Sequence, residues 1–321
     1  MFKNILAVRN DRFGEFLLNI PSFRALKQAN PGARLTLVVD PYVAELAKCI
    51  EGVDEVIRWG NAKHRFRELL NLSRQLKSKH FDLCVIFNSS KEFNIISYLA
   101  RIPARAGYNR KWGFLLNKKI EDKKALALKH EVEYNLDLAG VTGANTEDKT
   151  LSLSINDDII NNSLKALGLA GSERFIVVHP WTSDPVKQWP LEQFRKLAQK
   201  LVSESALKLV IIGAKEESGR SHTLFAGLEN KLVDITGKTD LVQLAAVLKR
   251  CQLLISGDSG PVHLACSVGT PVLALFRNDL SGKTANRWGP WGEDCAVIEK
   301  PGLNKITVEE VYNKAKEMLK V

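Results

Sequence analysis

Apolar residues follow two spacings along this chain, and the two spacings alternate from one end to the other. Short continuous apolar runs fit buried strands, whereas longer segments with apolar residues three or four positions apart fit amphipathic helices. The first half contains strand-like runs at 5–8, 35–39 and 81–87 and helix-like segments at about 16–29, 42–50 and 65–78. The second half contains strand-like runs at 175–179, 208–212, 232–235, 253–256 and 272–276 and helix-like segments at about 157–171, 191–204, 217–228, 241–249, 261–268 and 307–319. This alternation predicts an α/β fold of doubly wound parallel sheets covered by helices.

A chain of 321 residues suits two domains at about 150 residues each. The strand–helix series restarts at 175–179, after a glycine-containing stretch at 168–171. We therefore expect a domain at 1–168 and a second at 169–321, with the last helix either in the second domain or packed back on the first. The sequence has no internal repeat or low-complexity segment.

The formal charge of +10 indicates an anionic partner, with a merely solvated basic surface as the alternative. Basic residues crowd between 101 and 129, interleaved with Tyr108, Trp112 and Phe114, which suits an anionic or amphipathic ligand. Five cysteines without a C-x-x-C pair predict a reducing compartment. There is no signal peptide and no run of about 20 apolar residues, so we expect a soluble protein whose membrane contact is peripheral.

The segment 253–276, LLISGDSGPVHLACSVGTPVLALF, predicts strand, turn, helix, turn and strand. Asp258 or Ser259 suits the helix cap, and Pro261 suits its first turn. The free N–H groups at such a helix start form an anion site, for which phosphate is the usual ligand. Gly260 lets the backbone approach that phosphate, and Ser259 and His263 offer hydrogen bonds. The alternative is a capped helix with nothing bound.

A second polar cluster is the loop HPWTSDPVKQWP at 179–190, which follows a predicted strand. The hydroxyls of Thr182 and Ser183 with the ammonium of Lys187 would complete a diphosphate site without a metal. An ordinary surface loop is the alternative.

Three superficial matches carry no function. GKT occurs twice without the glycine that a P-loop needs five residues earlier, and GDSGP, shared with trypsin-like proteases, lies in a βαβ pattern. The six histidines lack metal-ligand spacing. We therefore expect no metal and no cofactor.

After the first strand, RNDRFGE at 9–15 opens a helix with a solitary Gly14, which is not a dinucleotide-binding fingerprint. Glu15 at that helix start is a candidate base for an incoming hydroxyl. A first-turn glutamate that interacts only with the helix dipole is the alternative.

Three segments, RNDRFGEFLLNIPSFRALK, HPWTSDPVKQWP and GDSGPVHLACSVGTPVLALF, resemble the ADP-heptose:lipopolysaccharide heptosyltransferases of glycosyltransferase family 9. The resemblance covers most of the chain. It implies a GT-B fold, in which two Rossmann-like domains face a central cleft, and inverting, metal-independent transfer at the cytoplasmic face of the inner membrane.

By this resemblance Glu15 stands where the family has its catalytic Asp, so the carboxylate is kept on a longer arm, and Lys187 stabilises the leaving group. The implied donor contacts are Thr182, Ser183, Lys187, Glu216, Glu217, Thr239, Asp258, Ser259, Gly260 and His263. The implied contacts with the anionic lipid A and core acceptor are Lys63, Arg65, Arg67, Arg105, Arg110 and Lys111. A second departure is Phe276-Arg277-Asn278, where the family continues with Gly-Pro-Thr.

Two other hypotheses remain open at this point. One is a GT-B enzyme that uses UDP-sugars, either a transferase or a non-hydrolysing epimerase. The other is a non-catalytic scaffold that binds sugar nucleotides or lipid. For the heptosyltransferase hypothesis the expected partners are a nucleotide sugar and an anionic lipid acceptor, without nucleic acid, and the protein is expected to be a monomer.

Overall fold

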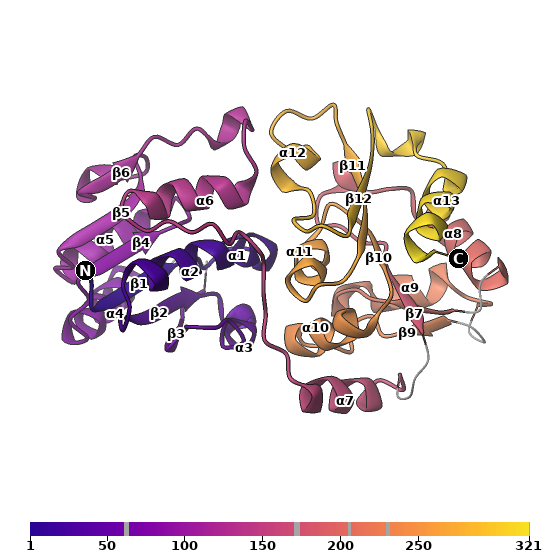
Figure 1. The fold of residues 1–321 in the computed structure, drawn as a ribbon, viewed down its shortest axis with the longest axis horizontal. Coiled ribbons are helices and arrows are strands. Elements are labelled where there is room, and N and C mark those ends of the chain that lie inside the picture. The colour runs from indigo at the N-terminus through magenta and orange to yellow at the C-terminus, as the bar shows by residue number, and fades with distance from the viewer. Residues whose placement is uncertain (61–63, 170–173, 205–206, 229–231, 321) are drawn as a thin grey trace. The chain divides into compact units, whose positions relative to one another are not determined.

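The computed structural model describes residues 1–60, 64–169, 174–204, 207–228 and 232–320. Its contacts divide the chain into two compact units, Met1–Thr150 and Leu151–Val321. Each unit is built on one six-stranded sheet in which every neighbouring pair of strands is parallel (Figure 1). The predicted fold class is confirmed.

The sheet of the first unit has the order β3-β2-β1-β4-β5-β6. Its strands are β1 (Asn4–Val8), β2 (Arg34–Val39), β3 (Glu55–Arg58), β4 (Leu83–Ile86), β5 (Ala104–Tyr108) and β6 (Lys118–Ile120). Its helices are α1 (Phe13–Leu17), α2 (Ile20–Ala29), α3 (Ala44–Ala47), α4 (Phe66–Ser78), α5 (Lys91–Leu99) and α6 (Glu131–Gly140), with short 3-10 turns η1 (Pro41–Val43), η2 (Gly113–Leu115) and η3 (Lys124–Leu126). The helices α4 and α5 pack together on one face, and α2 packs with α6 (Figure 1). The strand order reverses between β1 and β4, where doubly wound sheets bind their ligands.

The second unit repeats this order, because β12-β11-β10-β7-β8-β9 read from the other edge has the same succession. Its strands are β7 (Phe175–His179), β8 (Lys208–Ile211), β9 (Leu232–Asp234), β10 (Leu254–Gly257), β11 (Val272–Arg277) and β12 (Cys295–Lys300). Its helices are α7 (Asp157–Ala166), α8 (Leu191–Glu204), α9 (Ser218–Leu224), α10 (Leu241–Arg250), α11 (Gly260–Ser267), α12 (Ala285–Trp288) and α13 (Val308–Leu319), with 3-10 turns η4 (Pro185–Lys187), η5 (Lys215–Glu217) and η6 (Leu303–Lys305). Here the order reverses between β7 and β10.

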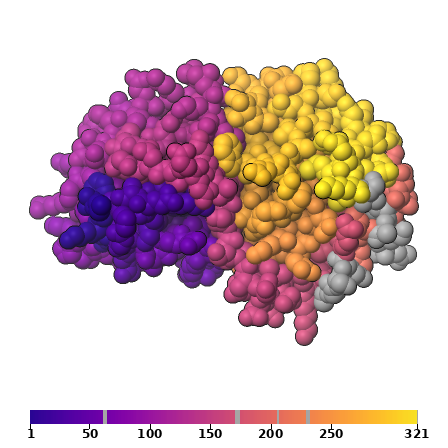
Figure 2. All heavy atoms as spheres, viewed as in Figure 1, coloured from indigo at the N-terminus to yellow at the C-terminus, as the bar shows by residue number. Residues whose placement is uncertain are grey.

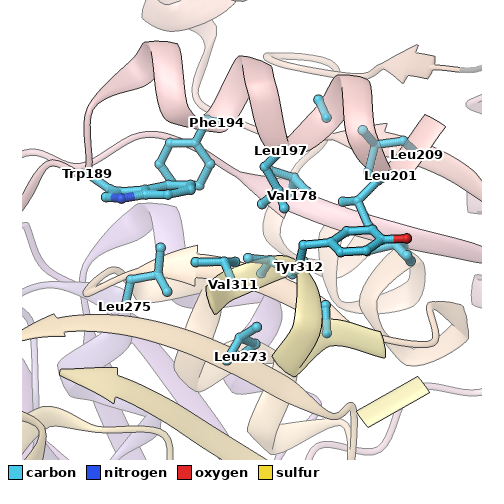
Figure 3. Packing of buried hydrophobic residues seen from close by; sticks show 14 of the residues in the cluster. Val178, Trp189, Phe194, Leu197, Leu201, Leu209, Leu273, Leu275, Val311 and Tyr312 are labelled. Carbon is cyan, nitrogen blue, oxygen red and sulfur yellow. The ribbon is translucent and has the colours of Figure 1, made fainter. Parts of the chain in front are cut away.

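One core of the second unit lies between its sheet and the helices α8 and α13. Side chains from both helices converge over strand residues such as Leu273 and Leu275 (Figure 3). Trp189 is fully buried there, its ring stands edge-on to Phe194 at 4.7 Å, and its Nε1 donates to the Ile306 carbonyl at 3.0 Å. In the space-filling view the yellow residues of α13 lie against orange residues of the same unit (Figure 2). The last helix thus belongs to the core of the second unit.

Several predicted boundaries differ from the structure. The division falls at Thr150 and not at 168, because α7 packs against α10 of the second unit. The helix predicted over 16–29 is two helices, since Asn19 Nδ2 donates to the Glu15 carbonyl at 2.8 Å and Pro21 has no N–H to continue the hydrogen-bond ladder.

Candidate functional site

In the first unit, polar residues follow β1 and β4 directly, at the point where the strand order reverses. Asn88 Nδ2 donates to Asn10 Oδ1 at 2.8 Å. Asn10 Nδ2 in turn donates to the Trp59 carbonyl, which follows β3, at 3.2 Å. These side chains tie the carboxyl ends of three strands together, so this edge of the sheet is the candidate site of the first unit.

The central residue of this edge is Arg9, the first residue after β1, whose side chain is 2% exposed. Its Nε donates to Asp11 Oδ1 at 2.7 Å and its Nη2 donates to Glu15. Its Nη1 donates to the Phe87 carbonyl at 3.2 Å. A buried guanidinium satisfied in this way holds the two carboxylates in place. Glu15 lies in the first turn of α1, as predicted, and its partner Arg9 is a residue that the sequence did not single out.

A third carboxylate completes this network from α6. Glu131 is buried, lies 3.9 Å from Arg9 Nη1, and pairs with Lys124 at 2.5 Å. The Lys124 ammonium also lies over the Tyr108 ring, 4.7 Å from its centre. Burial alone would lower the pKa of Arg9, but Asp11, Glu15 and Glu131 outweigh it and raise that pKa, so the guanidinium stays charged.

Asp11 is the titratable group that this arrangement perturbs. Burial raises the pKa of Asp11 to about 6. The charge of Arg9 opposes that rise, and the charge of Glu15 adds to it. A carboxyl group in this range changes its ionisation near neutral pH, which makes it a candidate participant in proton transfer.

In the second unit, the loop after β7 lies beside the end of β10. A Cβ built on Gly257 would lie 3.5 Å from the Lys187 carbonyl, an ordinary van der Waals distance, so the two segments are direct neighbours. Lys187 forms an ion pair with Asp258, and the two side chains are 18% and 12% exposed. Burial raises the pKa of Asp258, although Lys187 pulls it down. The two residues predicted to contact the donor are therefore brought together.

Where the strand order of this unit reverses, between β7 and β10, a histidine and two serines form a hydrogen-bonded cluster. His179 Nδ1 lies 3.1 Å from the hydroxyls of Ser256 and Ser259, which are 2.8 Å apart. Burial lowers the pKa of His179 to about 3, so its ring is neutral at physiological pH. Ser259 is the N-cap residue of α11 by position, as predicted, but its side chain makes no capping bond to the helix. The Ser259 hydroxyl is instead within hydrogen-bond distance of Ser256 and His179.

The other predicted donor contacts surround the same carboxyl edge. Gly260 is the first residue of α11, and His263 in that helix is 5% exposed. Thr182 Oγ1 accepts from the Asp184 N–H at 3.3 Å, and Ser183 is exposed. Thr239 lies just before the N-cap of α10.

The two glutamates of η5 differ in their surroundings. Glu216 is exposed, whereas a carboxylate oxygen of Glu217 accepts from the Ala214 N–H at 2.7 Å. Burial raises the pKa of Glu217 despite that bond. Of the two residues predicted to face a ribose, Glu216 has the carboxylate that is open to solvent.

Two cations missed by the sequence analysis fix the loop that carries Lys187. Arg277 Nη1 donates to the Val186 carbonyl at 3.1 Å, and Lys283 Nζ contacts Asp184 Oδ2 at 3.0 Å. Arg277 belongs to the segment that departs from the family pattern. The hydrogen bond from Arg277 to the Val186 carbonyl therefore gives this residue a structural role in the loop.

The predicted acceptor residues come from three segments of the first unit. Lys63 lies outside the described residues, and Arg65 and Arg67 are exposed at the start of α4. Arg110 and Lys111 follow the carboxyl end of β5, on the same edge as Arg9.

Arg105 differs from the other predicted acceptor residues. It is the second residue of β5 and lies toward the amino ends of the strands. Its guanidinium donates to the carbonyls of Leu115 (2.8 Å) and Ile102 (2.6 Å). The predicted grouping of Arg105 with an acceptor site at the carboxyl edge is not supported, because its donors are used to hold the backbone.

Exposed aromatic side chains accompany this basic segment. Trp112 and Phe114 are exposed, and the Lys91 ammonium lies 4.6 Å from the centre of a Trp112 ring. Among the described residues, no helix has the length and apolar character required to cross a bilayer. Within the same ranges, no three His, Cys, Asp or Glu side chains are grouped so that they could hold a metal ion.

Comparison with known proteins identifies the family. The model of glycosyltransferase family 9 (heptosyltransferase) matches residues 69–316. A Haemophilus influenzae protein described in its name as a glycosyltransferase is 29% identical over 90% of this chain and 86% of its own length. Lipopolysaccharide heptosyltransferase 2 of Salmonella typhimurium is 23% identical over 85% of this chain and 82% of its own length.

A solved structure agrees in fold. The Escherichia coli ADP-heptose lipopolysaccharide heptosyltransferase II superposes with a TM-score of 0.86 at 21% identity and covers 98% of both chains. The two six-stranded parallel sheets are those of the GT-B fold. The family model covers well over half of the chain, so this protein is a glycosyltransferase and belongs to family 9, the heptosyltransferase family.

Proposed function

We propose that this glycosyltransferase moves heptose from ADP-heptose to the inner core of lipopolysaccharide, with inversion at the anomeric carbon and without a metal ion. The observation that carries the proposal lies at the start of α11, where Lys187 forms an ion pair with Asp258 and the hydroxyl of the next residue, Ser259, is hydrogen-bonded to Ser256. The names of the relatives, two of which specify lipopolysaccharide heptosyltransferases, support the same substrate class.

The donor diphosphate binds at the start of α11 in this proposal. The positive end of the helix dipole favours an anion at the start of α11, and Gly260 presents no side chain that would block its approach. Lys187 adds a positive charge that can stabilise the negative charge that develops on the leaving ADP. Because a carboxylate repels phosphate, we assign Asp258 to the sugar hydroxyls, which can donate hydrogen bonds to it.

The reaction itself is a single displacement. The acceptor oxygen forms a bond to the anomeric carbon as the bond from that carbon to the diphosphate oxygen breaks. Its proton passes to Glu15, and ADP leaves with the electron pair of the broken bond. Attack on the face opposite to the leaving group inverts the anomeric carbon.

Nucleotide preference tests the donor. Thermal stabilisation by ADP, UDP, GDP and CMP is measured at equal concentration, where a ligand at about 100 times its dissociation constant adds about 2.7 kcal/mol. Stabilisation by ADP alone supports the proposal. A preference for UDP would instead indicate a UDP-sugar transferase.

Lys187→Met tests the anion site. We expect ADP affinity to fall about 10- to 100-fold, because a charge-assisted hydrogen bond contributes about 1.5–3 kcal/mol. The matched control is Lys196→Met, which removes an exposed lysine from α8 of the same unit. Equal affinities of the two variants would contradict the assigned position of the diphosphate.

Glu15→Gln tests the base. We expect loss of heptose transfer to a Kdo-containing lipid A acceptor, with ADP affinity unchanged, because Glu15 belongs to the first unit and the anion site to the second. Glu45→Gln, which removes an exposed carboxylate from the first turn of α3, serves as the control. Turnover by the Glu15 variant at the rate of the control would rule out this role.

We also propose that the acceptor is held by basic residues near Arg110 and Lys111, and that the enzyme works as a monomer on the cytoplasmic face of the inner membrane. The exposed Trp112 and Phe114 beside these cations suit a lipid surface that carries negative charge. Sedimentation with vesicles tests this part of the proposal. Binding to vesicles with anionic lipid, and not to neutral ones, is the expected result.

A further inference from the structure

Two carboxylates share one edge of the Arg9 guanidinium. The Nε and Nη2 atoms of arginine lie on the same side of its planar group, where a single carboxylate commonly binds through both oxygens. In this protein Nε binds Asp11 and Nη2 binds Glu15, so the two carboxyl groups lie side by side. Their side chains are 19% and 28% exposed, so both remain accessible from solvent.

The charges that face this pair do not balance it. Among the described residues, Arg9, the first residue after β1, has Asp11, Glu15 and Glu131 around it. Glu131 from α6 has a cation of its own in Lys124, which comes from η3.

A further titratable group near Arg9 is the Tyr108 phenol from β5. Its hydroxyl donates to the Tyr134 carbonyl, and burial raises its pKa, so it is neutral. One guanidinium therefore serves two neighbouring carboxylates, and their mutual repulsion disfavours the state in which both are ionised.

We propose that Asp11 is the second member of a carboxyl pair with Glu15 that holds one proton in common, and that it thereby sets the pH at which Glu15 becomes an effective base. This inference rests on the proposed role of Glu15 as the base. Asp11 acts through Glu15 and Arg9 and is a positioning residue. Neither the family match nor the names of the relatives assign it any role.

The pair works as follows. When it holds its proton, Glu15 has a reduced capacity to accept another one. When that proton leaves, the acceptor hydroxyl can give its own proton to the pair as its oxygen bonds to the anomeric carbon. The proton then returns to solvent after ADP and product leave. The raised pKa of Asp11 agrees with this order of events, since such a pair titrates in coupled steps.

Asp11→Asn is the variant that separates the two carboxyl groups. The asparagine Oδ1 can still accept from Arg9 Nε, so the fold around Arg9 is retained. The substitution removes the charge of Asp11 from the Arg9 edge that Glu15 shares. We expect the rising limb of kcat against pH, placed near 6 in the native enzyme, to shift down by about one unit or more, while KM for the donor is unchanged.

A measurement independent of turnover decides the pairing itself. The protein is labelled with carbon-13 at aspartate and glutamate side-chain carboxyls, and each midpoint is followed by NMR. The Asp11 signal is assigned by its loss in Asp11→Asn. In Glu15→Gln we expect the Asp11 midpoint to fall below about 6, while burial still keeps it above its ordinary value of about 4.

The outcomes separate the two proposals. An Asp11 midpoint that stays near 6 in Glu15→Gln overturns the pairing, whatever donor the enzyme uses. A coupled titration in an enzyme that fails to use ADP-heptose would refute the proposed substrate and leave the pairing supported. An unchanged pH limb in Asp11→Asn overturns the role of Asp11 in setting the working pH.

Discussion

The carboxyl pair should weaken the fold at neutral pH, and Asp11→Asn should reveal by how much. Burial raises the pKa of Asp11 from 3.8 to about 6, so the folded state binds a proton more tightly than the unfolded chain does. Stability from this group is therefore fully present below about pH 4 and is lost as the pH rises to about 6. Each pKa unit corresponds to about 1.4 kcal/mol, so the loss reaches at most about 3 kcal/mol.

The assay is urea unfolding of native protein and Asp11→Asn at several pH values between about 4 and 8. The asparagine does not titrate, so the variant should gain stability relative to native protein as the pH rises, with a constant difference above about pH 7. His179 has the opposite slope, because its lowered pKa favours folding as the pH rises, but both proteins carry it and its effect cancels in the difference. A difference that is constant across this range, or that shrinks with rising pH, would refute the assignment.

Three further outcomes follow from the structure. Since burial lowers the pKa of His179 to about 3, its imidazole NMR signals should not shift between about pH 5 and 8, and a midpoint near 6.5 would contradict its neutral role. The Cys266 thiol, 3.8 Å away, lowers the pKa of Cys295, so iodoacetamide mapped by mass spectrometry should modify Cys295 before the other cysteines. Trp189→Ala should destabilise the second unit by about 3–5 kcal/mol in urea, and Trp189→Phe by about 1–3 kcal/mol because the Ile306 carbonyl loses its donor. Equal losses in the two variants would mean that the hydrogen bond, and not ring packing, dominates.

The elements predicted best are those whose signals are local. The strand, helix and strand expected at 253–256, 261–268 and 272–276 match β10, α11 and β11 to within a residue or so at each end. Their apolar runs are continuous because both faces of a central parallel strand are buried. Pro261 and the positive φ of Gly269 mark the two ends of the helix between them.

The elements missed are those that depend on their neighbours. The strands β5 (ARAGY), β6 (KKI) and β12 (CAVIEK) lie at or near sheet edges, and the sequences of β5 and β6 contain few apolar residues in succession. Their strand state comes from pairing with β4, β5 and β11, which no short window of sequence reveals. The repeat of strand order between the units is hidden for the same reason, since it is a repeat of topology and not of residues.

The candidate site shows the same division. Lys187, Asp258 and Glu15 could be proposed from the sequence because each stands in a recognisable motif. Arg9 and Asp11 were missed because the environment of Arg9 is formed by α6 and by the residue that follows β4. Both segments are far from Arg9 in the sequence. The available signal was an arginine directly after a buried strand with acidic residues two and six positions later, a pattern that is uninformative until burial of the arginine is known.

The two units have the same strand order, but the residues at the point where that order reverses differ in charge. In the proposed roles, a base must change its charge at the working pH, and the first unit would provide for this by placing two carboxylates on one buried guanidinium. An anion site should keep its charge, and the second unit would provide for this with a lysine, a helix dipole and an imidazole kept neutral by burial. The neutral His179 ring lies within hydrogen-bond distance of the Ser259 hydroxyl, so it can keep that hydroxyl oriented beside a diphosphate bound there as proposed. On this argument the pH dependence of turnover should arise in the first unit, and Asp11 is where it can be altered without touching the donor site.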